Sequence, residues 1–148
     1  MKEQGKEVTT KVVNLKVIGA SGRIANHLKL DSESLVIYVQ RLRLIDDEPI
    51  ALFNSYIRKD IGISEDEDYS QSIYNLLENK YGISIKKGKK VIEVANATEE
   101  EANLLDIERG EPVLVIKNTT IDSRNFPIEY AEGIYRSDKY KYELVLNR

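Results

Sequence analysis

The sequence predicts an α+β fold in which an antiparallel sheet of about six strands is flanked by two or three helices. Three observations lead to this prediction. Runs rich in Val, Ile, Leu and Tyr recur along the chain and are too short and too β-branched for helices. Two pairs of these runs flank short turns, as in hairpins. Other segments place apolar residues three and four positions apart, which is typical of helices.

The first part of the chain supplies a strand, a short helix and a hairpin. Residues 12–18 form an apolar run that ends at Gly-Ala-Ser-Gly, which predicts a strand. Residues 23–30 suit one or two helical turns. The runs 35–45 and 50–58 flank the acidic turn 46–49, so we expect them to pair as an antiparallel hairpin.

The middle of the chain predicts the main helix. Within residues 71–81 apolar side chains recur at spacings of three and four, and Gly82 stands where a helix stop is expected. Residues 83–95 then predict a long strand, which the basic patch 86–90 interrupts.

The last third predicts a second short helix and three strands. Thr98-Glu99-Glu100-Glu101 matches a capping box, so we expect a helix from there to about Asp106. Residues 113–122 and 126–135 flank a Ser-Arg-Asn turn as a second hairpin, and residues 140–146 are expected to form a last strand. Because hairpins dominate, one sheet face is expected to pack on the helices while the other lines a cavity or a partner.

Composition indicates one soluble, cysteine-free domain. The chain has 148 residues, 22 basic and 25 acidic side chains and no cysteine, so disulfides and cysteine-bound metals are excluded. No run of roughly 18 apolar residues could span a membrane. The charged start lacks the apolar stretch of a secretory signal, so a cytoplasmic location is expected. A net charge of −3 argues against a DNA-binding surface on this chain.

Catalysis and metal binding have little support in the sequence. His27 is the only histidine, so a nucleophilic triad or a histidine metal site would depend on it alone. A surface or capping histidine is the commoner reading of such a residue. Neither a Walker-type phosphate loop nor the glycine fingerprint of a dinucleotide site occurs. We therefore expect no metal and no cofactor.

Two arginines stand in an otherwise apolar strand. Because side chains alternate along a strand, Arg41 and Arg43 are expected on one face with four apolar residues. These are Leu35, Ile37, Val39 and Ile45. Burying guanidinium groups costs free energy unless they are paired, so protein carboxylates or an anionic ligand should lie opposite them. The alternative is a strand at the edge of the hydrophobic core, whose arginines reach water or pair with acids such as Glu129.

Further polar residues could complete a ligand site. Ser72 and Tyr74 lie in the first turn of the predicted main helix, where free backbone amides favour an anion. Each also has a structural interpretation, as a helix-start residue and a packed aromatic. Glu129 and Tyr135 share one strand face, and Gly133 between them would leave room for a ligand. A purely structural Glu–Arg pair competes with this interpretation.

Six short motifs then occur together in one order and spacing. They are Arg41-Leu42-Arg43-Leu44, Glu48-Pro49-Ile50-Ala51, Ser72-Ile73-Tyr74-Asn75-Leu76-Leu77-Glu78, Thr98-Glu99-Glu100-Glu101-Ala102, Pro127-Ile128-Glu129-Tyr130 and Tyr135-Arg136-Ser137-Asp138-Lys139-Tyr140. Together they resemble the UTRA domain, the effector-binding half of GntR-type bacterial transcription regulators of the HutC subfamily.

The resemblance covers about residues 10–148 and implies an overall organisation. Residues 1–9 are expected to be the remnant of a linker to an N-terminal winged helix-turn-helix that this chain lacks. The implied fold is chorismate lyase-like, and the implied assembly is a homodimer joined through these domains. Contact with DNA would occur only through the N-terminal domain, and no contact with a membrane is expected.

The resemblance also implies a site for a small anionic effector, such as a sugar phosphate or an organic acid. In family members that bind sugar phosphates, two arginines, a serine and a tyrosine hold the phosphate. The corresponding residues here are Arg41, Arg43, Ser72 and Tyr74. Glu129 and Tyr135 match the residues that reach the sugar. Phe53 stands where amino-sugar-phosphate sensors tend to carry a glutamate, so it adds an apolar wall instead.

Two other functions remain open at this point. A chorismate lyase-like enzyme would share the fold and an arginine-lined anionic pocket, with Glu129 as its one plausible acid or base. A structural dimerisation domain without an effector is the second alternative. The sensor interpretation predicts saturable binding of an anionic metabolite without turnover. Turnover of chorismate would identify the enzyme, and a small ligand retained by the protein would count against the structural domain.

Overall fold

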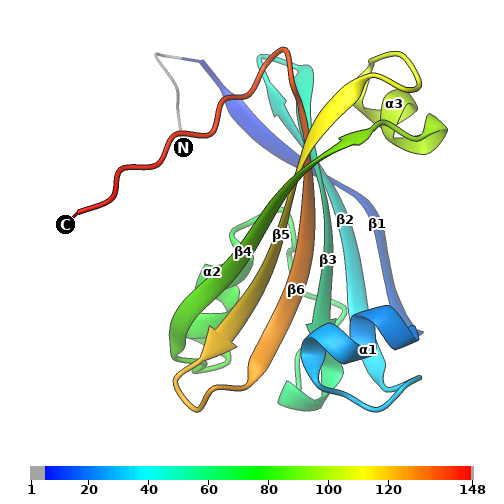
Figure 1. Ribbon diagram of the computed structural model, residues 1–148. Coiled ribbons are helices and arrows are strands. Elements are labelled where there is room, and N and C mark those ends of the chain that lie inside the picture. The colour runs from blue at the N-terminus through cyan, green and yellow to red at the C-terminus, as the bar shows by residue number, and fades with distance from the viewer. Residues whose placement is uncertain (1–5, 148) are drawn as a thin grey trace.

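Six antiparallel strands form one sheet in the computed structural model, which describes residues 6–147. In chain order the strands are β1 (Val8–Gly19), β2 (Leu35–Ile45), β3 (Glu48–Arg58), β4 (Ile85–Asn96), β5 (Pro112–Asp122) and β6 (Pro127–Arg136). Their spatial order is β1-β2-β3-β6-β5-β4, so β1 and β4 are the edges and β3 and β6 the centre (Figure 1). The predicted α+β class and antiparallel sheet are confirmed.

Helical segments cover both faces of this sheet. Helices α1 (Gly22–Leu28) and α3 (Glu99–Leu105) pack on the face that carries Val36 and Leu42. Helix α2 (Ile73–Asn75) continues as a π-helical turn, η2 (Leu76–Lys80), and packs on the opposite face, and a 3-10 turn, η1 (Lys59–Ile61), follows β3. The expectation that the helices share one face is therefore wrong, because β2 turns apolar side chains to both sides.

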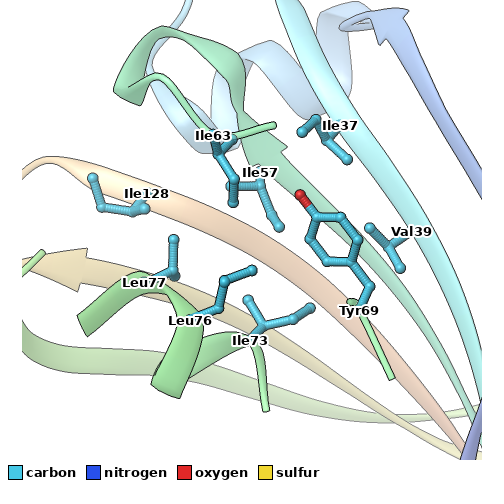
Figure 2. Packing of buried hydrophobic residues seen from close by; sticks show 9 residues of the cluster. All are labelled: Ile37, Val39, Ile57, Ile63, Tyr69, Ile73, Leu76, Leu77 and Ile128. Carbon is cyan, nitrogen blue, oxygen red and sulfur yellow. The ribbon is translucent and has the colours of Figure 1, made fainter. Parts of the chain in front are cut away.

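A cluster of apolar side chains holds α2 and η2 against the sheet (Figure 2). Its buried members are Ile37, Val39, Ile57, Ile63, Tyr69, Ile73, Leu76, Leu77 and Ile128. Leu76 and Leu77 are 4% and 0% exposed. Full burial of one such side chain contributes about 1.5–3 kcal/mol, so this cluster fixes the position of a helical segment too short to be stable alone.

Both predicted hairpins form, and their turns explain why. Between β2 and β3, Asp46 and Asp47 have φ angles of 49° and 66°, as a two-residue hairpin turn requires. Between β5 and β6, Asn125 adopts a φ of 67°, and the Asp122 carboxylate accepts hydrogen bonds from two turn amides. Aspartate and asparagine tolerate this left-handed region better than other residues with a Cβ.

Two predicted elements differ in their interior. Strand β4 runs unbroken through the basic patch 86–90, because it is an edge strand whose lysine side chains are exposed to water. The predicted helix 71–81 begins at Ile73, with Ser72 as its N-cap, and changes to a π-helical turn at Leu76. Gly82 follows with a φ of 64°, as the predicted stop. The capping box of α3 forms between Thr98 and Glu101 as expected.

The two ends of the chain differ from their predicted structures. Residues 140–146 form no strand, since no other described strand lies beside them, and the segment runs away from the sheet (Figure 1). Of the predicted linker 1–9, residues 1–5 lie outside the described residues. Val8 and Thr9 already belong to β1, opposite Ile45 and Leu44. No helix within residues 6–147 is long and apolar enough to cross a membrane.

Candidate ligand-binding site

A cavity of about 240 Å³ lies between α2 and the sheet. All the residues that the sequence predicted for a ligand site border it, namely Arg41, Arg43, Phe53, Ser72, Tyr74, Glu129 and Tyr135. They come from β2, β3, β6 and the start of α2. Residues up to 94 positions apart in sequence therefore meet around one cavity.

Strand register explains how these residues meet. Arg41 lies opposite Phe53, Phe53 opposite Gly133, and Gly133 opposite Ile116, so one row of residues crosses four strands. Side chains two positions away point to the same face. This alternation puts Arg43 beside Arg41, and puts Glu129 and Tyr135 on the cavity face of β6. The predicted shared face of the two arginines is confirmed.

The arginine end of the cavity carries positive charge that the described residues do not neutralise. The guanidinium carbons of Arg43 and Arg41 lie 4.6 Å and 5.6 Å from the centroid of the Phe53 ring. Among residues 6–147, no carboxylate forms an ion pair with either arginine. Burial lowers the pKa of Arg41, opposed by Glu129 and reinforced by Arg43. An anion bound here would favour the charged guanidinium.

Ser72 borders this end but is already occupied as a helix cap. Its Oγ accepts a hydrogen bond from the backbone amide of Asn75 at 3.2 Å. A neighbouring hollow of about 380 Å³ shares Ser72 and both arginines with the cavity and reaches Thr10 of β1. Because α2 itself spans three residues, the dipole expected at a helix start contributes little, and attraction for an anion rests on the guanidinium groups.

Glu129 lies at the opposite end in a chain of hydrogen bonds. The Thr120 hydroxyl donates to Oε1 of Glu129 at 3.3 Å and bonds the Tyr74 hydroxyl at 2.8 Å. Asn118 Nδ2 donates to the same Tyr74 hydroxyl at 3.0 Å. Glu129 is 3% exposed, and burial raises its pKa, against the opposing effect of Arg41. This end therefore favours a neutral carboxyl group among hydroxyl and amide partners.

Four polar residues that line or adjoin the cavity were not predicted from the sequence. Ser55, Lys90 and Asn118 border the cavity, and Thr120 bonds Glu129 beside it. Ser55 could have been found, since it follows Phe53 by two positions on the same strand and must share its face. Lys90 and Asn118 lie opposite each other on β4 and β5, and only the register of those strands places them here.

Tyr135 and Gly133 shape the wall beside the arginines. The Tyr135 ring meets the edge of Phe53 at 88° and stacks on Tyr140 with centroids 4.0 Å apart. Burial raises the pKa of Tyr135 to about 12, so its hydroxyl remains a hydrogen-bond donor at neutral pH. A Cβ at Gly133 would lie 2.9 Å from Tyr135 and 3.1 Å from Phe53. The absence of a side chain at Gly133 therefore leaves room for both rings.

His27 lies apart from the cavity. Its ring stacks on Tyr130, on the sheet face that carries α1, with centroids 3.9 Å apart. Burial lowers the pKa of His27, so the neutral ring is favoured. Within the part of the chain that the structure describes, no group of three or more acidic or histidine side chains could hold a metal ion.

Solved structures with this architecture are domains of transcription regulators. The effector domain of PhnF from Mycobacterium smegmatis superposes with a TM-score of 0.90 over 98% of this chain and 90% of that one, at 22% sequence identity. The possible transcriptional regulator YydK from Bacillus subtilis gives a TM-score of 0.90 at 26% identity, over 97% of this chain and 65% of that one. The fold is thus that of GntR-family effector domains.

Sequence comparison defines the family. The UTRA domain model matches residues 3–141, so the chain belongs to the UTRA domain family, and the resemblance drawn from the six motifs is confirmed. The HTH-type transcriptional repressor NagR of Bacillus subtilis (strain 168) is 32% identical over 149 residues, covering 100% of this chain and 61% of that protein. The chain spans 55–61% of the length of such curated relatives, which are named as transcriptional regulators or repressors.

Proposed function

We propose that this chain is the effector-sensing and dimerisation domain of a GntR-type transcription regulator, a repressor. The cavity beneath α2 binds a small anionic metabolite such as a sugar phosphate. The chain acts in the cytoplasm as a homodimer, and DNA is bound by a winged helix-turn-helix domain outside this chain. Arg41, Arg43, Ser72, Tyr74, Glu129 and Tyr135 contact the effector, and Phe53 forms one wall.

The observation that carries this proposal is a set of buried polar atoms without partners. Among residues 6–147 the clearest are Arg41 Nε and Asn118 Oδ1, on two side chains that line this one cavity. Ser55 Oγ lies in the same cavity beside Glu129, where a hydrogen bond between the two side chains lowers the pKa of Glu129 against the larger effect of burial. A buried polar group left unpaired costs about 1–3 kcal/mol, so such groups are rare without a reason. A ligand or ordered water that satisfies them removes that cost.

The chemistry of these atoms defines the ligand. Arg41 Nε is a donor of one guanidinium group beside a second, that of Arg43, so it requires an acceptor on an anion such as a phosphate or a carboxylate. Asn118 Oδ1 is an acceptor that lies over Gly88 of β4, so it requires a hydroxyl or an amine as its donor. A phosphate at one end and hydroxyl groups at the other, as in a sugar phosphate, meets both requirements.

Binding can regulate DNA recognition only through a difference in affinity. If the dimer has two arrangements, the effector shifts their populations by as much as its affinities for them differ. In this proposal the effector favours one spacing of the two attached DNA-binding domains. The names of the relatives as regulators and repressors support this role.

A thermal-shift screen tests the proposal. Sugar phosphates and organic acids are compared with the parent sugars that lack phosphate. A ligand that binds the folded state raises its stability by mass action, so we expect concentration-dependent shifts from the anionic compounds only. Equal shifts from the parent sugars, or no shift from any anion, would contradict the proposal. Turnover of chorismate in the same samples would favour the enzyme alternative instead.

A further inference from the structure

The end of the cavity opposite the arginines is built on one row of cross-strand partners. Ser55 of β3 lies opposite Ala131 of β6, Ala131 opposite Asn118 of β5, and Asn118 opposite Lys90 of β4. All four residues border the cavity. Because side chains alternate along β4, the same register that turns Lys90 to the cavity turns its neighbour Lys89 to the other face of the sheet.

Lys90 has a different environment from the rest of the basic patch 86–90. Of the four lysines in this patch, Lys90 borders the cavity and the other three do not. Its side chain is exposed, so the ammonium group lies at the rim. Among residues 6–147, no carboxylate forms an ion pair with Lys90. Its charge acts on Glu129 inside the cavity, where it opposes the effect of burial on the pKa of that carboxyl group.

The lining of the cavity carries more positive than negative charge. Its cations are Arg41, Arg43 and Lys90, and its one carboxyl group is that of Glu129. Burial favours the neutral form of this carboxyl group, because it raises the pKa of Glu129. A phosphate group with nearly two negative charges offsets the two arginines. Lys90 then still lacks a counter-charge, which a second anionic group on the same ligand would supply.

The chemistry of this end favours a carboxylate over an amine. Lys90 would repel an ammonium group, whose one acidic partner in the lining is Glu129, and burial opposes the ionisation of Glu129. A carboxylate is attracted by Lys90 and accepts a hydrogen bond from the neutral Glu129 carboxyl group, which has one O–H to donate. The acceptor Asn118 Oδ1 still requires a donor, and a hydroxyl group beside the carboxylate supplies it.

We propose that the effector carries a carboxylate as well as a phosphate, and that Lys90 selects it by pairing with the carboxylate. Phosphorylated sugar acids have this composition, with a phosphate at one end, a carboxylate at the other and hydroxyl groups between. Arg41 and Arg43 hold the phosphate, and Asn118 accepts a hydrogen bond from a hydroxyl group. The inference rests on the proposed sensor function and deepens it, because it names the class of ligand and a residue that determines specificity.

Two open-chain compounds test the proposed selection. The compounds 6-phosphogluconate and sorbitol 6-phosphate share the phosphate and the chain of hydroxyl groups, and differ only where the first has a carboxylate and the second a CH₂OH group. Calorimetric titration of the wild type is expected to show about threefold to tenfold tighter binding of 6-phosphogluconate, as for a charge-assisted contact at an exposed rim. Equal affinities for the two compounds overturn the inference.

Variants of Lys90 assign the selection to this residue. Lys90→Met is expected to bind both compounds with equal affinity, and Lys90→Glu to prefer sorbitol 6-phosphate. Lys89→Met is the matched control, since it removes the same charge from the adjacent position on the other face of β4, and it should keep the wild-type preference. A preference for 6-phosphogluconate that persists in Lys90→Met overturns the role of Lys90. Tighter binding of glucosamine 6-phosphate than of glucose 6-phosphate by the wild type overturns the choice of a carboxylate over an amine.

Titration with inorganic phosphate separates this inference from the sensor function. Binding of phosphate by the wild type, without tighter binding of 6-phosphogluconate than of sorbitol 6-phosphate, overturns the inference and leaves the sensor function standing. If phosphate, the two test compounds and every anion of the thermal-shift screen all fail to bind, the sensor function is overturned and this inference with it.

Discussion

The guanidinium of Arg43 lies over the ring of Phe53, 4.6 Å from its centroid. Arg41 approaches the same ring at 5.6 Å, so one aromatic side chain supports both cations of the cavity. Contacts of this kind contribute about 0.5–2 kcal/mol each, depending on solvent exposure. Phe53 therefore does more than close the cavity, because it also orients the two groups that we assign to the anion.

Substitution of Phe53 tests this role. Phe53→Leu keeps an apolar wall but removes the ring face, so we expect phosphate affinity to fall by roughly 2- to 30-fold, the range that a cation–π contact implies. Calorimetric titration with inorganic phosphate measures the change. Wild-type affinity in Phe53→Leu would show that the ring does not support the arginines in holding the anion.

Gly133→Ala tests the packing of the cavity wall. The new Cβ would lie 2.9 Å from Tyr135 and 3.1 Å from Phe53, closer than ordinary contacts allow. We expect a loss of about 1–3 kcal/mol in the free energy of unfolding, measured with denaturant, as for other overpacked sites. Gly22→Ala is the control, since nothing lies within 4 Å of a Cβ there and alanine suits a helix. Equal stability of the two variants would contradict this packing.

The burial of Glu129 leads us to expect a specific pH dependence of the free energy of unfolding. Burial raises its pKa in the folded state, so the folded protein holds this proton more tightly than the unfolded chain does. The resulting contribution to stability is complete below the unfolded pKa, about 4.3, and is lost as the pH rises through the folded pKa. We therefore expect Glu129→Gln to lose less stability than the wild type as the pH rises above about 4.

Denaturant unfolding at a series of pH values measures this difference. Glu78→Gln is the control, because it removes an exposed carboxylate from η2 and should leave the wild-type profile unchanged. Parallel profiles for Glu129→Gln and the wild type would show that the Glu129 carboxyl is not destabilised by burial.

Alternation along strands made much of the site predictable. The shared face of Arg41 and Arg43 follows from the two-residue period of β2, and that of Glu129 and Tyr135 from the period of β6. The two hairpins were equally predictable, because Asp46, Asp47 and Asn125 tolerate the positive φ angles of tight turns. The positions of Lys90 and Asn118 at the cavity were not predictable, since a shift of one residue in the pairing of β4 with β5 would turn them to the other face.

Residues 140–146 show a different limit. Their alternating apolar residues predict a strand, but the structure forms none there, because alternation along a segment does not say whether a neighbouring strand is available to pair with it. The change from an α-helix to a π-helix at Leu76 was also not predictable. Leu76 and Leu77 are buried in the π-helical turn, and an α-helix with nearly the same spacing of apolar residues would bury them too.

The central claim is that Arg41 and Arg43 hold an anionic effector, and calorimetry of their alanine variants tests it most directly. The titrant is the phosphorylated compound that gives the largest thermal shift, with inorganic phosphate as a second probe and Arg109→Ala, at an exposed turn, as the control. Each of Arg41→Ala and Arg43→Ala should weaken binding by more than about tenfold, or about 1.4 kcal/mol, while the control binds like the wild type. Equal affinity in the wild type and both variants would contradict the account.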